Sequence, residues 1–269
     1  TLLISARATE PVIEDPRVAA ITLTGSGPAG GAVASAAGRV LKKTVLELGG
    51  SDPCIVLEDA EIERAARVAA RSRLINTGQS CIAAKRFIVV EEVADAFTGA
   101  FVEELSRLTV GDPMDPATDV GPMARVDLRD ELHDQVTRSV AAGARLVMGG
   151  RIPGGAGAFY PVTLLTDVTP EMAVAREETF GPVAPVIVVR DEAAAVALAN
   201  ASELGLGASV WTADLQRGAA LARRIELAAS AVPQRQQLLA AMGISLHTLD
   251  RFRQQHPQNG VAGGHQPMR

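Results

Sequence analysis

Short apolar runs alternate with longer amphipathic stretches along most of this chain. Each run has the length and β-branched content of a buried strand, and each stretch has the apolar spacing of a helix packed on one side. Strands that alternate with helices form largely parallel sheets, because parallel neighbours need a crossover connection. The sequence therefore predicts an α/β fold. The predicted strands are 19–23, 44–48, 54–57, 86–90, 144–148, 183–189 and 208–212, and the predicted helices are 33–42, 58–74, 93–108, 128–142, 192–199 and 214–226.

The composition changes abruptly after Glu226. Seven of the ten Gln residues and three of the four His residues fall in 227–269, and Asp250 is the only acidic residue there. Such a segment lacks the apolar pattern of a sheet, so we expect a poorly ordered tail. The break also suggests a truncated or frameshifted reading frame as a hypothesis, which resequencing of the locus would test.

Charge and cysteine content exclude several classes of partner. The formal net charge is −5, which does not predict a nucleic-acid partner. No apolar run approaches the roughly 18 residues that a membrane span needs. Two cysteines in a chain of this length form no disulfide framework and fit a reducing, cytoplasmic location. The His residues are scattered, so no metal site is expected.

Cys81 is the first candidate for chemistry. It follows the polar loop 76–80 and precedes three small apolar residues and then Lys85 and Arg86. A cysteine at the start of a helical turn has its thiolate favoured by free N–H groups and the helix dipole, and nearby cations add to this. The alternative is a small buried core cysteine, which is the commoner fate of this residue type.

Glu47 is the second candidate, in the otherwise apolar stretch 44–50. A carboxylate at a strand end beside two glycines can be partly buried with a raised pKa, as a general base requires. It could equally point into water. A third reading comes from residues 25–30, which match the G-x-G-x-x-G pattern between a strand and a helix. In an ordinary dinucleotide fold, an acid at the end of the next strand binds the ribose.

Four segments in order resemble the aldehyde dehydrogenase superfamily, over about residues 1–226. Residues 46–53 look like its general-base motif, and residues 76–81 look like its nucleophile motif, 34 residues apart from Glu47 to Cys81. Residues 177–182 look like its cofactor-ribose motif, and residues 24–26 look like its phosphate turn. The resemblance favours Glu47 as the base over the ribose-binding role.

The resemblance implies an aldehyde dehydrogenase-like fold with NAD or NADP as cofactor. Residues 1–48 would be the C-terminal part of a Rossmann-type dinucleotide domain, residues 49–226 an α/β catalytic domain, and residues 227–269 the atypical tail. Cys81 and Glu47 would be catalytic, with no metal. The expected cofactor-binding residues are Gly25, Ser26, Gly27, Pro28, Ala29, Gly30, Leu48, Gly49, Glu178 and Phe180.

The implied reaction is oxidation of an aldehyde to an acid through a thiohemiacetal and a thioester on Cys81. Residues 49–53 and 83–87 look most like a bacterial succinate-semialdehyde dehydrogenase branch. A carboxylate-binding Arg of that group stands six residues before the cysteine, where this chain has Ile75, with Arg71 and Arg73 nearby.

Two alternatives stay open. One is a related enzyme that passes the thioester to coenzyme A, although relatives of that kind often lack the base. The other is a non-catalytic fragment, because the family's oxyanion Asn and adenosine-ribose Lys would lie upstream of Thr1. Its closing segment, with the oligomerisation arm, should follow Glu226. We therefore expect a homo-oligomeric parent enzyme and a poorly active fragment.

Overall fold

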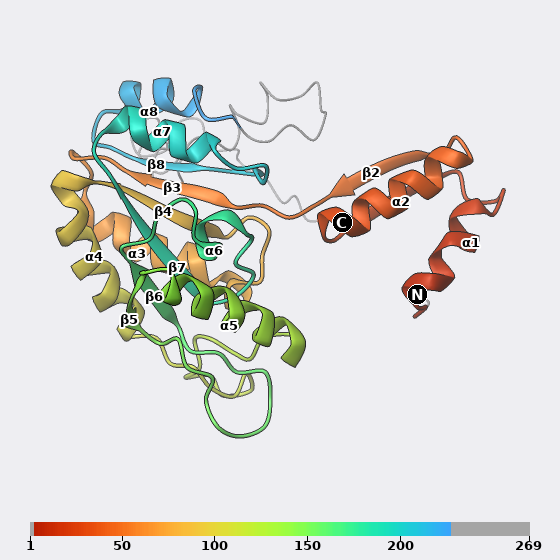
Figure 1. Ribbon diagram of the computed structural model, residues 1–269, viewed down its shortest axis with the longest axis horizontal. Coiled ribbons are helices and arrows are strands. Elements are labelled where there is room, and N and C mark those ends of the chain that lie inside the picture. Colours follow the sequence, from red (N-terminus) through yellow and green to blue (C-terminus); the bar gives the residue numbers. More distant parts are fainter. Residues whose placement is uncertain (1–2, 227–269) are drawn as a thin grey trace, which may run out of the picture. The chain divides into compact units, whose positions relative to one another are not determined.

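The computed structural model describes residues 3–226 (Figure 1). The chain separates into two compact units, which are residues 1–50 and 51–269. The division falls two residues beyond the boundary that the motifs predict. Each unit is described separately below. The predicted Gln-rich tail, residues 227–269, lies outside the described residues.

The first unit is a strand–helix–strand arrangement. Strands β1 and β2 pair in parallel from Ala20↔Lys43 to Thr24↔Glu47. Ser26 precedes the connecting helix and its Oγ accepts a hydrogen bond from the N–H of Ala29 at 3.4 Å. This sequence of elements is the one that the glycine-rich pattern predicts. The elements are a 3₁₀ turn Ala6–Ala8, α1 Thr9–Glu14, β1 Ala20–Thr24, α2 Gly27–Arg39 and β2 Lys43–Glu47.

The second unit contains a six-stranded sheet with the order β5-β6-β7-β4-β3-β8. All neighbouring strands are parallel except β5 and β6, which are antiparallel. The predicted α/β class with a largely parallel sheet is confirmed. The strands are β3 Asp52–Val56, β4 Ala84–Val90, β5 Arg145–Met148, β6 Thr163–Thr166, β7 Val183–Val189 and β8 Ser209–Trp211.

Helices cover both faces of this sheet (Figure 1). Alternate residues of β4 separate the two cores: Phe87 packs with α3 and α4, whereas Ile88 packs with α7 and α8. Helices α5 and α6 lie on the same face as α7 and α8, against Leu165 and Ile187. Burial on both faces explains why β7 and the later residues of β3 and β4 are continuously apolar. The helices are α3 Ile62–Leu74, α4 Glu91–Ser106, α5 Val126–Ala141, α6 Ala173–Arg176, α7 Glu192–Asn200 and α8 Leu215–Ala222, with a 3₁₀ turn at Ile75–Gly78.

Some elements differ from the sequence prediction. Strand β6 and helix α6 have only four residues each and were not predicted. Helix α3 begins at Ile62 rather than near Glu58. Asp59 instead accepts hydrogen bonds from the Thr212 hydroxyl at 2.7 Å and the Ala213 N–H at 3.0 Å. Within residues 3–226, no helix is long and apolar enough to cross a membrane.

Candidate active site

Cys81 lies in a tight turn immediately before β4. The N–H of Ala83 donates to the carbonyl of Ser80 at 3.2 Å, and the strand begins at Ala84. Cys81 is partly exposed, whereas the other cysteine, Cys54, is buried in β3. The sequence suggested that Cys81 starts a helical turn. The structure shows a single hydrogen-bonded turn that leads directly into β4, so no regular helix follows Cys81.

The loop before Cys81 has three consecutive residues in the left-handed region. They are Asn76, Thr77 and Gly78, with φ of 50°, 58° and 75°. A Cβ atom on Gly78 would lie 2.4 Å from the carbonyl oxygen of Gly181, so only glycine fits. Gln79 fixes the loop further, since its Oε1 accepts from the N–H of Ala124 at 2.8 Å. The backbone conformation around the thiol is thus set by packing and hydrogen bonds together.

Arg73 is fully buried beneath this loop. Its guanidinium donates to the carbonyls of Gly78 at 2.6 Å, Ala84 at 2.9 Å and Thr179 at 3.2 Å. Burial lowers the pKa of Arg73 to about 9, and the charges of Glu178 and Asp52 oppose that shift. With Nη1 and Nη2 donating to backbone oxygens, Arg73 joins three chain segments.

Lys85 is the cation nearest to Cys81, and it is also buried. Its Nζ donates to the carbonyls of Ser80 at 2.8 Å, Cys81 at 2.9 Å and Ala83 at 3.4 Å. The same ammonium lies 3.4 Å from Oε1 of Glu178. Burial lowers the pKa of Lys85 and the charge of Arg73 lowers it further, while Glu178 raises it. The sequence suggested a cation that favours the thiolate, but the strongest contacts of this ammonium are to backbone oxygens.

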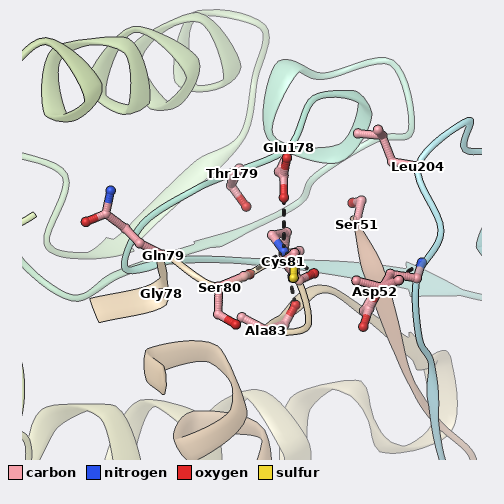
Figure 2. Close-up of polar contacts among 12 residues, drawn as sticks. Ser51, Asp52, Gly78, Gln79, Ser80, Cys81, Ala83, Glu178, Thr179 and Leu204 are labelled. Carbon is pink, nitrogen blue, oxygen red and sulfur yellow. Dashed lines mark hydrogen bonds and ion pairs between the residues drawn. The ribbon is translucent and has the colours of Figure 1, made fainter. Parts of the chain in front are cut away.

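The segment with Glu178 and Phe180 lies next to the Cys81 turn. Figure 2 shows the Glu178 side chain directed toward that turn. The backbone carbonyl of Glu178 accepts from Nε2 of Gln135 on α5 at 3.2 Å. The Lys85 ammonium lies 6.0 Å from the centre of the Phe180 ring, which is 38% exposed. The structure therefore brings the predicted nucleophile together with two predicted cofactor residues.

Asp52 is a buried carboxylate that sequence reasoning did not single out. It accepts from the N–H groups of Gly207 at 2.8 Å and Leu206 at 3.4 Å. Burial raises its pKa, and the charges of Lys85 and Arg86 oppose the rise. A Cβ atom on Gly207 would lie 2.7 Å from Oδ2 of Asp52, so this connection before β8 closes tightly on the start of β3.

These side chains share one edge of the sheet. Cys81 precedes β4, Glu178 precedes β7, and Asp52 begins β3, so all lie at the amino ends of parallel strands. Open α/β sheets usually bind ligands at the carboxyl ends. The candidate site therefore lies at the opposite edge from the one that this general rule indicates.

The other predicted residues lie in the first unit. Glu47 is the last residue of β2, with an exposed side chain, and its carbonyl accepts from the N–H of Gly25 at 3.0 Å. Residues 25–29 are exposed in the turn before and into α2. A Cβ atom on Gly30 would lie 2.6 Å from Cδ2 of Leu48, so this glycine permits close helix–strand packing. Within residues 3–226, no group of three His, Cys, Asp or Glu side chains could hold a metal ion.

A family model supports the resemblance inferred from these motifs. The model described as the aldehyde dehydrogenase family matches residues 3–242. The chain belongs to the aldehyde dehydrogenase family. The match to the family runs past Glu226 into the segment of unusual composition.

Two curated relatives match most of this chain but only about half of their own length. Succinate semialdehyde dehydrogenase, NAD(P)+, of Escherichia coli (strain K12) is 53% identical over 215 residues, which are 80% of this chain and 46% of the relative. Succinate-semialdehyde dehydrogenase, NADP(+), of Mycolicibacterium paratuberculosis is 54% identical over 214 residues, 80% of this chain and 45% of the relative. The chain thus spans about half the length of these relatives.

A solved structure extends the similarity to the fold. Succinic semialdehyde dehydrogenase from Streptococcus pyogenes, in complex with NADP+ as the cofactor, matches with a TM-score of 0.81 and 37% identity. The match covers 84% of this chain and 50% of that one. The predicted fold of the aldehyde dehydrogenase family is confirmed.

Proposed function

We propose that this chain carries the thiol chemistry of an aldehyde dehydrogenase that oxidises succinate semialdehyde to succinate. The observation that carries the proposal is the partly exposed Cys81 turn beside Glu178 and Phe180. The names of the relatives support the substrate class. Since Ile75 stands where a carboxylate-binding Arg would be expected, and Arg73 is committed to backbone carbonyls, another group would bind the substrate carboxylate.

The residues of the first unit fit a dinucleotide. Helix α2 begins at an exposed turn, and a Cβ atom on Gly27 would meet nothing within 4 Å, so space is open there. The free N–H groups at a helix start favour a phosphate. Residues 25–30 would hold the pyrophosphate of NAD or NADP, with Leu48 and Gly49 near the nicotinamide and Glu178 on its ribose. When bound, this cofactor accepts a hydride.

The proposed aldehyde oxidation uses Cys81 as the nucleophile and Glu47 as the base. The Cys81 thiolate forms an S–C bond to the aldehyde carbon, and the carbonyl π electrons move to oxygen. The Cys81 N–H stabilises this oxyanion. With NAD or NADP bound, the cofactor would supply the hydride acceptor, so collapse of the thiohemiacetal oxyanion would leave a thioester on Cys81. Glu47 takes a proton from water, which adds to the thioester and releases the acid and the thiolate.

The test is reduction of NAD or NADP by succinate semialdehyde, followed by absorbance. Cys81→Ala should abolish cofactor reduction, and the matched change at the buried thiol, Cys54→Ala, should keep it. Glu47→Gln should retain one rapid turnover and lose the steady state, because hydrolysis of the thioester is blocked.

Aldehyde oxidation by Cys81→Ala would overturn the proposal. Formation of an acyl-coenzyme A product would show that the thioester is transferred to coenzyme A instead of being hydrolysed. Absence of cofactor binding would favour the non-catalytic alternative.

A further inference from the structure

The ammonium of Lys85 is committed mainly to the backbone of the nucleophile turn. Buried lysines usually need a carboxylate partner. Here the shortest contacts of Nζ are the carbonyls of Ser80 and Cys81, at 2.8 and 2.9 Å, whereas the contact with Glu178 is 3.4 Å. Since an ammonium has three donors, two of them hold the peptide groups on either side of the Cys81 Cα.

This contact fixes the direction of one particular N–H. Among the described residues no peptide bond is cis. In a trans peptide the C=O and N–H bonds point in opposite directions. Because the Ser80 carbonyl points at the ammonium, the N–H of Cys81, which belongs to the same peptide, points away from it. Within residues 3–226 this N–H has no hydrogen-bond acceptor.

The same contact strengthens that N–H as a donor. A charged donor forms a stronger hydrogen bond to a carbonyl than a neutral one does. Hydrogen bonds in a chain polarise one another, so a peptide that accepts at oxygen donates better at nitrogen. The Cys81 N–H therefore points away from the Lys85 ammonium, has no acceptor within residues 3–226, and is a stronger donor than an ordinary peptide N–H.

We propose that Lys85 is a positioning residue that aims and polarises the Cys81 N–H toward the oxygen of an attacked carbonyl group. The inference rests on the proposed thiol chemistry and deepens it. When the sulfur bonds to the carbonyl carbon, negative charge forms on that oxygen, which then accepts a hydrogen bond from the Cys81 N–H. Lys85 itself touches neither sulfur nor substrate in this scheme; it acts through the Ser80 carbonyl.

A pair of reactions on one thiol separates this role from general support of the loop. Acylation of Cys81 by p-nitrophenyl acetate passes through an oxyanion and needs no cofactor, whereas alkylation by iodoacetamide forms none. Both rates are measured on the intact chain, with peptide mass mapping to distinguish Cys81 from buried Cys54. Loss of one oxyanion donor typically slows such a step by about 10²–10³-fold. Lys85→Met should therefore slow acylation at least about tenfold and change alkylation by less than about threefold.

Two further variants complete the experiment. Arg67→Met removes an exposed cation from α3 and should leave both rates unchanged. If Lys85→Met does not fold, Lys85→Gln, whose amide can still donate, should show a smaller loss of the same kind.

The outcomes separate this inference from the proposed function. Equal slowing of acylation and alkylation, or no slowing of either, would overturn the role of Lys85. Wild-type acylation no faster than that of a cysteine peptide would also overturn it. Lys85-dependent acylation without cofactor reduction by aldehyde would leave the inference standing and count against the dehydrogenase activity of this chain.

Discussion

At the scale of single residues, Gly78 shows how one position shapes the nucleophile loop. It has a positive φ, and its Cα faces the carbonyl of Gly181 closely enough to exclude any side chain. Asn76 and Thr77 also have positive φ, but Asn76 is exposed and Thr77 is partly exposed, whereas Gly78 is buried. Strain of this kind persists only where the neighbouring structure fixes it.

Gly78→Ala should lower the free energy of unfolding by more than about 2 kcal/mol, because the Cβ atom adds a backbone clash to the cost of a positive φ. Urea unfolding measures this. Gly99→Ala is the matched control: Gly99 is exposed within α4, and a Cβ atom there meets nothing within 4 Å. Gly99→Ala should raise the free energy of unfolding by about 0.5–1 kcal/mol. Equal effects of the two variants would contradict the packing argument.

Asp52 predicts a pH dependence of stability. Burial raises its pKa above the ordinary 3.8, so the folded chain keeps this proton at pH values where the unfolded chain has lost it. The contribution of Asp52 to stability therefore falls as the pH rises through that window. Asp52→Asn should gain stability relative to wild type as the pH rises above the ordinary pKa of 3.8, measured by urea unfolding. A relative gain toward acid pH would show the opposite shift.

At the scale of elements, the apolar pattern predicted most strands and helices because both faces of the sheet are buried. Strand β6 escaped prediction because four residues between loops carry too little pattern; its pairing with β5 and β7 makes it a strand. The contacts of Lys85 and Arg73 could not be predicted for a different reason. Their hydrogen-bond partners are backbone carbonyls, which a sequence does not display.

Arg73 links α3 to β4 and to the segment before β7, and its loss should be costly. Arg73→Met leaves buried carbonyls without donors, so the free energy of unfolding should fall by about 3 kcal/mol or more. Arg67→Met, on an exposed position of the same helix, should change it by less than about 0.5 kcal/mol. Chemical denaturation of both variants checks this. Similar small changes would mean that Arg73 contributes little to holding the loop.

At the scale of the whole molecule, the motifs correctly predicted the family, whereas the domain boundary after residue 48 stays a prediction. The motifs could not predict at which end of the parallel strands the Cys81 thiol lies. They also left the roles of Glu47 and of residues 25–30 as proposals, because these residues belong to the first unit and Cys81 to the second.

The two units should differ in local stability. Neither β1 nor β2 contains a fully buried residue, and among residues 3–50 the hydrophobic core cluster comprises Ile13, Ala36 and Ala37 with a few partly buried neighbours. Every residue of β4 is buried. Amides of β1 and β2 should therefore exchange with solvent at least about 100-fold faster than those of β4. Comparable protection in native-state hydrogen exchange would contradict this.

Cys81 stands three residues before β4, which pairs with a strand on each side. Inner strands are among the last parts of a domain to open. Heat should therefore not unfold the nucleophile turn before the sheet. The reactivity of the Cys81 thiol should be lost at the same temperature at which the sheet unfolds cooperatively.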